Sequence, residues 1–198
     1  MRRYILNSPA VEPLSLPEIK RWLRVDHSDD DGLILGLIKA ARERIEARTG
    51  RALMAQSWRI ILDRWPGDGR ILLPLMPVLS VPAVQISDTA GVLLPLAPTT
   101  YRLEPGSEPP LLAVTGVPQP GRDRNGIEID VVAGYGLSGE DCPEALRQAM
   151  RLLVSEAYER RGPDQAENRR APIAVEIEAL ISPYRSIRLG KSALEQAA

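Results

Sequence analysis

Apolar residues recur every three or four positions in four stretches of the chain, two before residue 50 and two after residue 140. This spacing predicts four amphipathic helices. Ser15 can cap the first helix, with Pro17 in its first turn and Glu18 placed to complete a capping box. The second helix ends at Thr49-Gly50, where glycine favours a left-handed cap. The four apolar stripes contain Leu16, Ile19 and Leu23; Leu33, Ile34, Leu37, Ile38, Ala41 and Ile45; Leu146, Ala149, Met150, Leu153 and Ala157; and Ile173, Ile177, Leu180 and Ile181.

After residue 50 the helical period gives way to short β-like runs. Eleven of the 18 prolines lie between Pro66 and Pro120, where they exclude helix interiors. Turn sequences such as Asn125-Gly126 divide the runs. So many prolines favour short strands at sheet edges over a closed barrel. The expected strands are Trp58–Leu62, Arg70–Leu73, Val78–Val81, Val84–Ser87, Tyr101–Leu103, Leu111–Val114 and Ile127–Val132.

We therefore expect an α+β protein, in which an antiparallel helical bundle carries an inserted Pro-rich β section and a C-terminal helix and tail. Residues 1–50 would form the N-terminal helices, and residues 51–136 would form the β-rich insertion. Residues 137–162, whose helix we expect to begin at Asp141, would return as a core helix. Residues 163–198 would form a loop, a short helix and a tail that docks on a partner.

The composition narrows the class of protein. With 198 residues, 44% of them hydrophobic, the chain can bury a sizeable core without any phenylalanine. Its formal net charge of −1 gives no whole-chain attraction to nucleic acid or to an anionic membrane. Cys142 is the only cysteine, which excludes an internal disulfide and favours a reducing compartment. No segment resembles a signal peptide or a membrane span, so we expect a protein that stays in the cytoplasm unless a particle carries it out.

Gly134, Gly136 and Gly139 spell a GxGxxG pattern between an expected strand and an expected helix. In dinucleotide-binding proteins such glycines let the backbone approach a pyrophosphate at the start of the helix. Here Glu140 and Asp141 open the helix and would occupy or repel an anion. The required second strand is also missing, because a Gly-Pro pair and a polar loop follow the helix. A glycine-rich turn before an Asp-capped helix is the favoured interpretation, and a small nucleotide-binding enzyme that uses this loop is the alternative.

The sequence contains no convincing catalytic or metal-binding set. His27, the only histidine, lies in a polar link between two helices. Cys142 lies in the first turn of a helix, where its acidic neighbours oppose formation of a thiolate. The acidic run around His27 fails the calcium-loop pattern, which needs carboxylates at the positions of His27 and Ile38. We therefore expect no enzyme activity, no cofactor and no bound metal.

Short motifs in a fixed order carry a resemblance to a known family. They are Leu14-Ser15-Leu16-Pro17-Glu18-Ile19-Lys20, Asp29-Asp30-Asp31, Glu46-Ala47-Arg48-Thr49-Gly50-Arg51, Leu73-Pro74-Leu75-Met76-Pro77-Val78, Ala133-Gly134-Tyr135-Gly136, Asp141-Cys142-Pro143-Glu144-Ala145-Leu146, Tyr158-Glu159-Arg160-Arg161 and Ala179-Leu180-Ile181-Ser182-Pro183-Tyr184-Arg185. From Leu14 to Arg185 the chain resembles the head–tail connector (adaptor) proteins of long-tailed phages and of phage-like gene transfer agents. Cys142 departs from the aliphatic residue more common at that position in the family, and it leaves the helix cap intact.

The resemblance implies a structural protein rather than an enzyme. Such adaptors assemble as a ring, usually twelve-fold, beneath the portal. The ring extends the DNA channel and links the capsid to neck or tail components. The implied partners are the portal protein, further copies of the chain, a downstream neck, stopper or tail protein, and double-stranded DNA that passes through the lumen without sequence-specific binding, with no membrane. The implied location is the neck of a particle that is assembled in the host cytoplasm.

The C-terminal segment is the part that we expect to contact the portal. Its helix is short and follows a polar loop, so it would be marginal without a partner. Aromatic and arginine side chains beyond the helix would be the anchors, since these are frequent interface hot spots. A chain truncated after Pro172 would then fold but fail to assemble with the portal. The expected portal-binding residues are Ile177, Leu180, Ile181, Tyr184, Arg185 and Arg188.

A DNA-binding regulator built on the first two helices is a second alternative. Its outward-facing arginines would contact phosphates, and its binding would weaken steeply with salt. The interleaved Glu43 and Glu46 argue against this function. The arginines concerned are Arg21, Arg24, Arg42 and Arg44.

Overall fold

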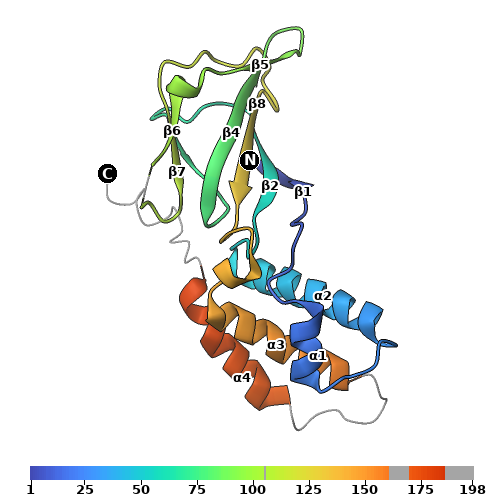
Figure 1. Cartoon of the computed structure of the whole chain (residues 1–198). Coiled ribbons are helices and arrows are strands. Elements are labelled where there is room, and N and C mark those ends of the chain that lie inside the picture. The colour runs from blue at the N-terminus through green and yellow to red at the C-terminus, as the bar shows by residue number, and fades with distance from the viewer. Residues whose placement is uncertain (105, 161–169, 186–198) are drawn as a thin grey trace.

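The computed structural model describes residues 1–104, 106–160 and 170–185. A β part and a helical part lie end to end (Figure 1). The chain passes between them at residues 8–15, 50–55 and 134–138. The helical part contains α1 (Leu16–Leu23), α2 (Asp31–Thr49), η2 (Gly139–Asp141), α3 (Glu144–Glu159), α4 (Arg170–Ile181) and η3 (Ser182–Tyr184).

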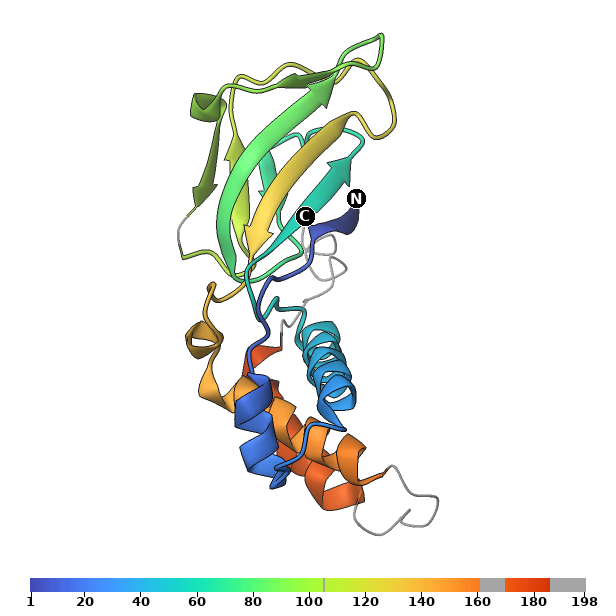
Figure 2. The ribbon, with the colours of Figure 1, turned by 45° about the vertical axis from the view of Figure 1, so that its right-hand side comes forward.

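The β part consists of two antiparallel sheets that share one apolar core. The larger sheet has the order β1-β2-β8-β4-β5, and its strands curve side by side above the helices (Figure 2). Along β8 the side chains alternate between buried and half-buried, as expected for a central strand that has one face against the core. The strands are β1 (Arg2–Asn7), β2 (Gln56–Leu62), β8 (Ile127–Ala133), β4 (Val78–Ser87) and β5 (Leu93–Pro95) in the larger sheet, and β3 (Arg70–Leu72), β7 (Leu111–Val114) and β6 (Tyr101–Glu104) in the smaller, with η1 (Pro98–Thr100) before β6.

The helical part has its own core, in which α3 packs between α2 and α4. Each fully buried aliphatic side chain there contributes about 1.5–3 kcal/mol relative to an exposed one. None of the described helices is long and apolar enough to cross a membrane. The core side chains include Ile34, Ile38 and Ile45 of α2, Leu146 and Met150 of α3, and Ile177 and Ile181 of α4.

The mixed α+β class expected from the sequence is confirmed. The strand β1 was not expected, and it places residues 2–7 in the sheet rather than with the N-terminal helices. Its six residues are all exposed, so the strand lacks the alternation that identifies a half-buried strand. The three-residue strand β5 was also missed, because its run Leu93–Pro95 is apolar throughout and ends in proline.

Two boundaries differ from the expectation. The runs expected at 78–81 and 84–87 form one strand, β4, which continues through Pro82. The ladder with β8 shifts register between Ser80 and Ala83, so the proline lies at an irregularity where it removes no regular ladder bond. The helix expected from Asp141 begins instead at Glu144, because Asp141 closes the preceding short helix η2.

Candidate assembly interface

The glycine-rich segment after β8 is a close crossing of two backbones. The φ angle of Gly134 is 142°, and a Cβ atom there would overlap the backbone of Met54 and Ala55. The Gly134 N–H donates to the carbonyl oxygen of Pro77 at 2.9 Å. The Ala55 N–H donates to the carbonyl oxygen of Gly136 at 2.8 Å. Glycine is therefore required here by the packing of the segment that joins the two parts of the molecule.

A carboxylate fills the position that a phosphate would need in a nucleotide loop. The Ser138 N–H donates to Oδ2 of Asp141 at 2.9 Å, and a Cβ atom at Gly136 would overlap that same carboxylate. The Ser138 side chain caps η2 in return, which completes a capping box. The Asp141 carboxylate therefore takes a loop N–H that an anion would need, which disfavours the nucleotide-binding alternative.

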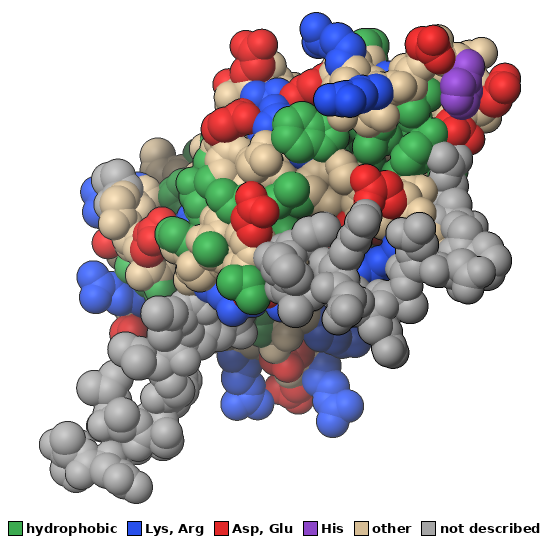
Figure 3. All heavy atoms as spheres, turned by 90° about the horizontal axis from the view of Figure 1, so that it is seen from below, with side chains coloured by type: hydrophobic (Ala, Val, Ile, Leu, Met, Phe, Trp, Pro, Cys, Tyr) green, Lys and Arg blue, Asp and Glu red, His purple; other side chains and the backbone are tan. Residues whose placement is uncertain are grey.

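The remaining candidates for chemistry have no catalytic setting. Cys142 is buried, and burial raises the pKa of its thiol to about 12, so the thiol stays neutral. His27 is exposed and lies at the margin of the helical end, beside acidic side chains (Figure 3). Among residues 1–104, 106–160 and 170–185, no cluster of three or more histidine, cysteine or acidic residues could hold a metal ion.

Helix α4 holds the expected portal-binding residues in two different environments. Ile177 and Ile181 are buried against α3 in the helical core, and Leu180 is partly buried against the same core. Tyr184 also packs partly on this core. Arg185 keeps exposed surface and forms an ion pair with Glu178 at 2.5 Å. Arg188 lies outside the described residues.

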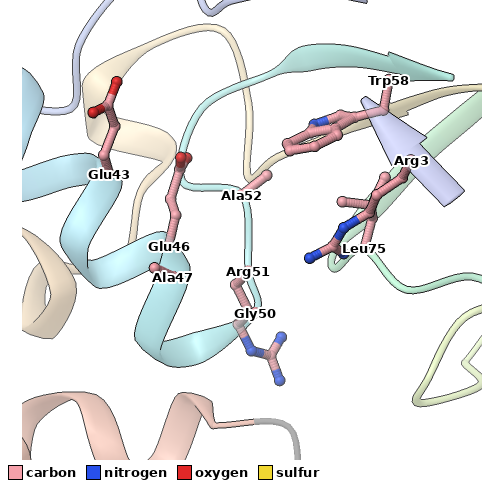
Figure 4. Close-up of a pocket in the computed structure, with 9 residues that line it drawn as sticks. All are labelled: Arg3, Glu43, Glu46, Ala47, Gly50, Arg51, Ala52, Trp58 and Leu75. Carbon is pink, nitrogen blue, oxygen red and sulfur yellow. The ribbon is translucent and has the colours of Figure 1, made fainter. Parts of the chain in front are cut away.

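The end of α4 is fixed to the junction between the two parts. Nε of Arg51 donates to the carbonyl oxygen of Tyr184 at 2.7 Å. Arg51 also lines a pocket of about 220 Å³ between the end of α2 and the larger sheet (Figure 4). On the other side of this pocket, the guanidinium of Arg3 lies 5.6 Å from the ring centre of Trp58. The pocket therefore opens beside strand β1, to which Arg3 belongs.

Glu46 connects α2 to the first residues of the β part. Its carboxylate accepts hydrogen bonds from the Leu53 N–H, from Nε2 of Gln56 and from Nη1 of Arg42, all at 2.8 Å. Burial raises the pKa of Glu46 and outweighs these hydrogen bonds and the positive charge of Arg42, which lower it. Arg42 is only 3% exposed and also binds Glu12, so the expectation that it faces outward was wrong.

Glu18 connects α1 to α3. Ser15 Oγ accepts the Glu18 N–H at 3.3 Å, as the expected cap requires. The Glu18 carboxylate lies 3.0 Å from Nη2 of Arg147 and 2.6 Å from Nη2 of Arg151. Burial acts to raise the pKa of Glu18, but the hydrogen bond from Arg151 and the charges of both arginines outweigh it, so the pKa lies below its ordinary value of 4.5. Arg151 also covers the exposed ring of Trp22.

The pairing of Glu18 predicts an acid-dependent loss of stability. Because its folded-state pKa is lowered, the carboxylate stabilises the fold above pH 4.5, and this contribution is lost as the pH falls through the folded-state value. We expect Glu18→Gln to lower the free energy of unfolding by about 1.5 kcal/mol at pH 7. Urea titrations from pH 7 to pH 3 should show this difference shrink as the pH falls below 4.5. Glu159→Gln, at an exposed carboxylate near the end of α3, is the control and should leave the profile unchanged.

The polar groups of this region join helices to one another and to the β part of the chain. A family model for phage gp6-like head-tail connector proteins matches residues 13–89. A chain from the neck of an empty gene transfer agent (GTA) particle, computed with C6 symmetry, is 30% identical with a TM-score of 0.81. A chain from the virion of the native GTA particle gives the same identity and TM-score. A chain from the native neck with C12 symmetry is 30% identical with a TM-score of 0.75.

Each of these three comparisons covers 96% of this chain and 98% of the other. No curated protein sequence matches the chain. The chain belongs to the family of head–tail connector (adaptor) proteins of long-tailed phages and phage-like gene transfer agents, which are structural proteins of the particle. The resemblance expected from its short motifs is thus confirmed.

Proposed function

We propose that the protein is the adaptor that forms a ring under the portal of a phage-like particle. The ring extends the DNA channel and links the capsid to a downstream neck, stopper or tail protein. The observation that carries this proposal is the likeness, over nearly the whole chain, to proteins of GTA necks that have C12 and C6 symmetry. In this proposal the ring contains twelve copies, lies in the particle neck and is assembled in the host cytoplasm.

The charge distribution suits a channel through which DNA must slide. A strongly basic lumen would hold phosphates through counterion release, whereas a net charge of −1 gives no such attraction. Several arginines are neutralised within the chain, including Arg42 by Glu12 and Glu46, and Arg59 by Asp130. On the helical end acidic and basic side chains are mixed, with hydrophobic ones between them (Figure 3). This mixture also disfavours a DNA-binding regulator.

The helical part and the β part would have different roles in assembly. In this proposal residues 1–50, apart from strand β1, and residues 137–162 provide an antiparallel helical bundle as the core of the ring. The Pro-rich section 51–136, completed by β1, faces neighbouring subunits or tail components. Residues 163–198 form the segment that docks on the portal.

Within this last segment we propose two roles, which the burial of the side chains supports. Ile177 and Ile181 are buried, so they hold α4 against α3 and act on the portal contact only by positioning the helix. Tyr184 and Arg185 stand where the described chain leaves the helical part, and with Arg188 they are the proposed direct contacts. A truncation after Pro172 would remove two core side chains together with the contacts, so it cannot separate folding from docking.

A truncation after Arg185 separates the two. We expect electron microscopy of the full chain mixed with its portal to show an added ring beneath the portal. The truncated chain should unfold at the same urea concentration as the full chain but add far fewer rings, because it lacks Arg188 and the rest of the tail. Arg64→Ala, which changes an exposed arginine of the β part, is the control and should add rings normally. A portal that gains no ring from the full chain contradicts the proposed function, and undiminished rings from the truncated chain contradict the tail assignment.

A further inference from the structure

Within residues 1–104, 106–160 and 170–185, nothing pairs with the outer side of strand β1, the edge of the larger sheet. It pairs with β2 on one side only, its six residues are all exposed, and it contains neither proline nor lysine. Proteins usually blunt such edges with charges, prolines or a covering element, because the free N–H and C=O groups recruit other strands. Its two arginines do not serve this purpose. Arg2 donates to Oδ1 of Asn125, and Arg3 donates to the carbonyl oxygen of Pro74 and covers Trp58.

The same edge exposes apolar side chains on both of its faces. Tyr4, Ile5 and Leu6 are 45%, 44% and 38% exposed. Successive side chains of a strand point to opposite faces of the sheet. Each face also carries an arginine, Arg2 or Arg3, but three consecutive exposed apolar side chains in an edge strand are what a neighbouring chain could cover. The pocket lined by Arg3, Trp58 and Leu75 lies beside this edge and could receive a side chain of that neighbour.

At the opposite edge of the larger sheet, the first half of β4 lies at the same height along the strands as the end of β1. Strand β5 pairs with β4 only from Gln85 to Ser87, so no strand of the described part of the chain pairs with the first half of β4 on its outer side. Asn7 pairs with Ser57, Ser57 with Val132, and Val132 with Ser80, so the end of β1 and the start of β4 share one level across the sheet. Leu79, next to Ser80, is 47% exposed.

We propose that β1 of one copy packs against the first half of β4, residues 78–81, of the next copy in the ring. This inference rests on the proposed ring. A ring closed by rotation joins two different surfaces on opposite sides of each subunit, so β1 cannot meet the β1 of its neighbour. The proposal places the strands of the larger sheet along the ring axis. Rotation about that axis preserves height, so it brings together the two sheet edges that lie at the same level. The partner of this surface is therefore a second copy of the chain, and Leu79 receives the apolar side chains of β1.

Disulfide cross-linking tests the pairing, because the only native cysteine, Cys142, is buried. Both test sites are exposed, so Ile5→Cys and Leu79→Cys should not disturb folding. In purified portal–adaptor complexes, mild oxidation of the double variant should convert most of the protein into a ladder of covalent multimers. Each single variant should form no covalent multimers under the same oxidation. The control pair joins Ile5→Cys to Val175→Cys, which lies on α4 at an exposed position, and it should give no ladder.

Four results would overturn the inference. Rings visible by electron microscopy with no ladder from the double variant would exclude this contact while leaving the proposed function intact. A covalent dimer from Ile5→Cys alone would mean that β1 meets its own equivalent, and a disulfide to the portal would mean a different partner. Absence of any ring would remove the proposed function and this inference together. As an independent variant, Ile5→Lys should abolish ring formation without changing the urea midpoint of the free chain.

Discussion

Replacing Gly134 by alanine is expected to lower the free energy of unfolding by about 4 kcal/mol, through a strained left-handed backbone and overpacking. The φ angle of 142° is unfavourable for alanine, and the added methyl group would overlap the backbone of Met54 and Ala55. Neither group can move away as a flexible side chain could. Since a domain is stable by only about 5–15 kcal/mol, this loss is a large fraction of the total. Urea denaturation followed by far-UV circular dichroism measures it.

Gly36→Ala is the matched control for this substitution. Gly36 lies within α2, and a Cβ atom there would meet nothing within 4 Å. Alanine in a helix interior is favoured over glycine by about 0.8–1 kcal/mol, so this variant should be slightly stabilised. A Gly134→Ala variant as stable as the wild-type chain would show that the two backbones cross less closely than in the structure. A nucleotide that raised the melting temperature of the wild-type chain would also reopen the alternative function of this loop.

Replacing Glu46 by alanine is expected to cost about 3–5 kcal/mol, because it leaves buried polar groups without their partner. The carboxylate accepts bonds from the Leu53 N–H, Gln56 and Arg42, and both Gln56 and Arg42 are only 3% exposed. Arg42 would retain Glu12, but the bonds that tie α2 to the β part would be lost. The free energy of unfolding from urea titration at pH 7 is the quantity to compare.

Glu43→Ala provides the control for Glu46, since both residues pair with Arg42 from the same helix. The Glu43 carboxylate lies 3.7 Å from Nη2 of Arg42, and its side chain is 58% exposed. Exposed pairs of this kind contribute about 0–1 kcal/mol. Similar losses for the two variants would mean that the hydrogen bonds of Glu46 add little beyond an ordinary surface charge. Glu46→Gln keeps one acceptor oxygen, so its loss of unfolding free energy should lie between those of Glu46→Ala and Glu43→Ala.

Local patterns predicted the elements whose signals lie within a few residues. The expected glycine cap of α2 is present, with Gly50 at a φ angle of 71°. The seven expected β runs all coincide with strands, apart from Leu73, which follows the end of β3, and two of the runs form the single strand β4. The edge strand β1 escaped prediction, since an edge exposed on both faces has no alternation to detect. Only its pairing with β2, more than fifty residues along the chain, makes it a strand.

The sites were harder to predict than the elements. The sequence suggested that the apolar side of α4 was free for a partner, but α3 already covers Ile177 and Ile181. No local signal separates an apolar stripe that meets its own chain from one that meets another. The same limit applied to Arg42, whose three acidic neighbours include Glu12, thirty residues away. Such a pair is visible only once the fold brings the two side chains together.

By itself the sequence determined the four helices, the strands with clear turn or proline boundaries, the absence of an internal disulfide and the family resemblance. These depend on periodicity, caps, composition and short motifs, which are properties of neighbouring residues. The tertiary structure decided which apolar side chains are buried in the chain's own core and which remain exposed, as on β1. It also decided which charges are neutralised and that Gly134 serves a backbone crossing. The physical reason is that burial and ion pairing depend on contacts between residues far apart in the chain, such as Glu18 with Arg151.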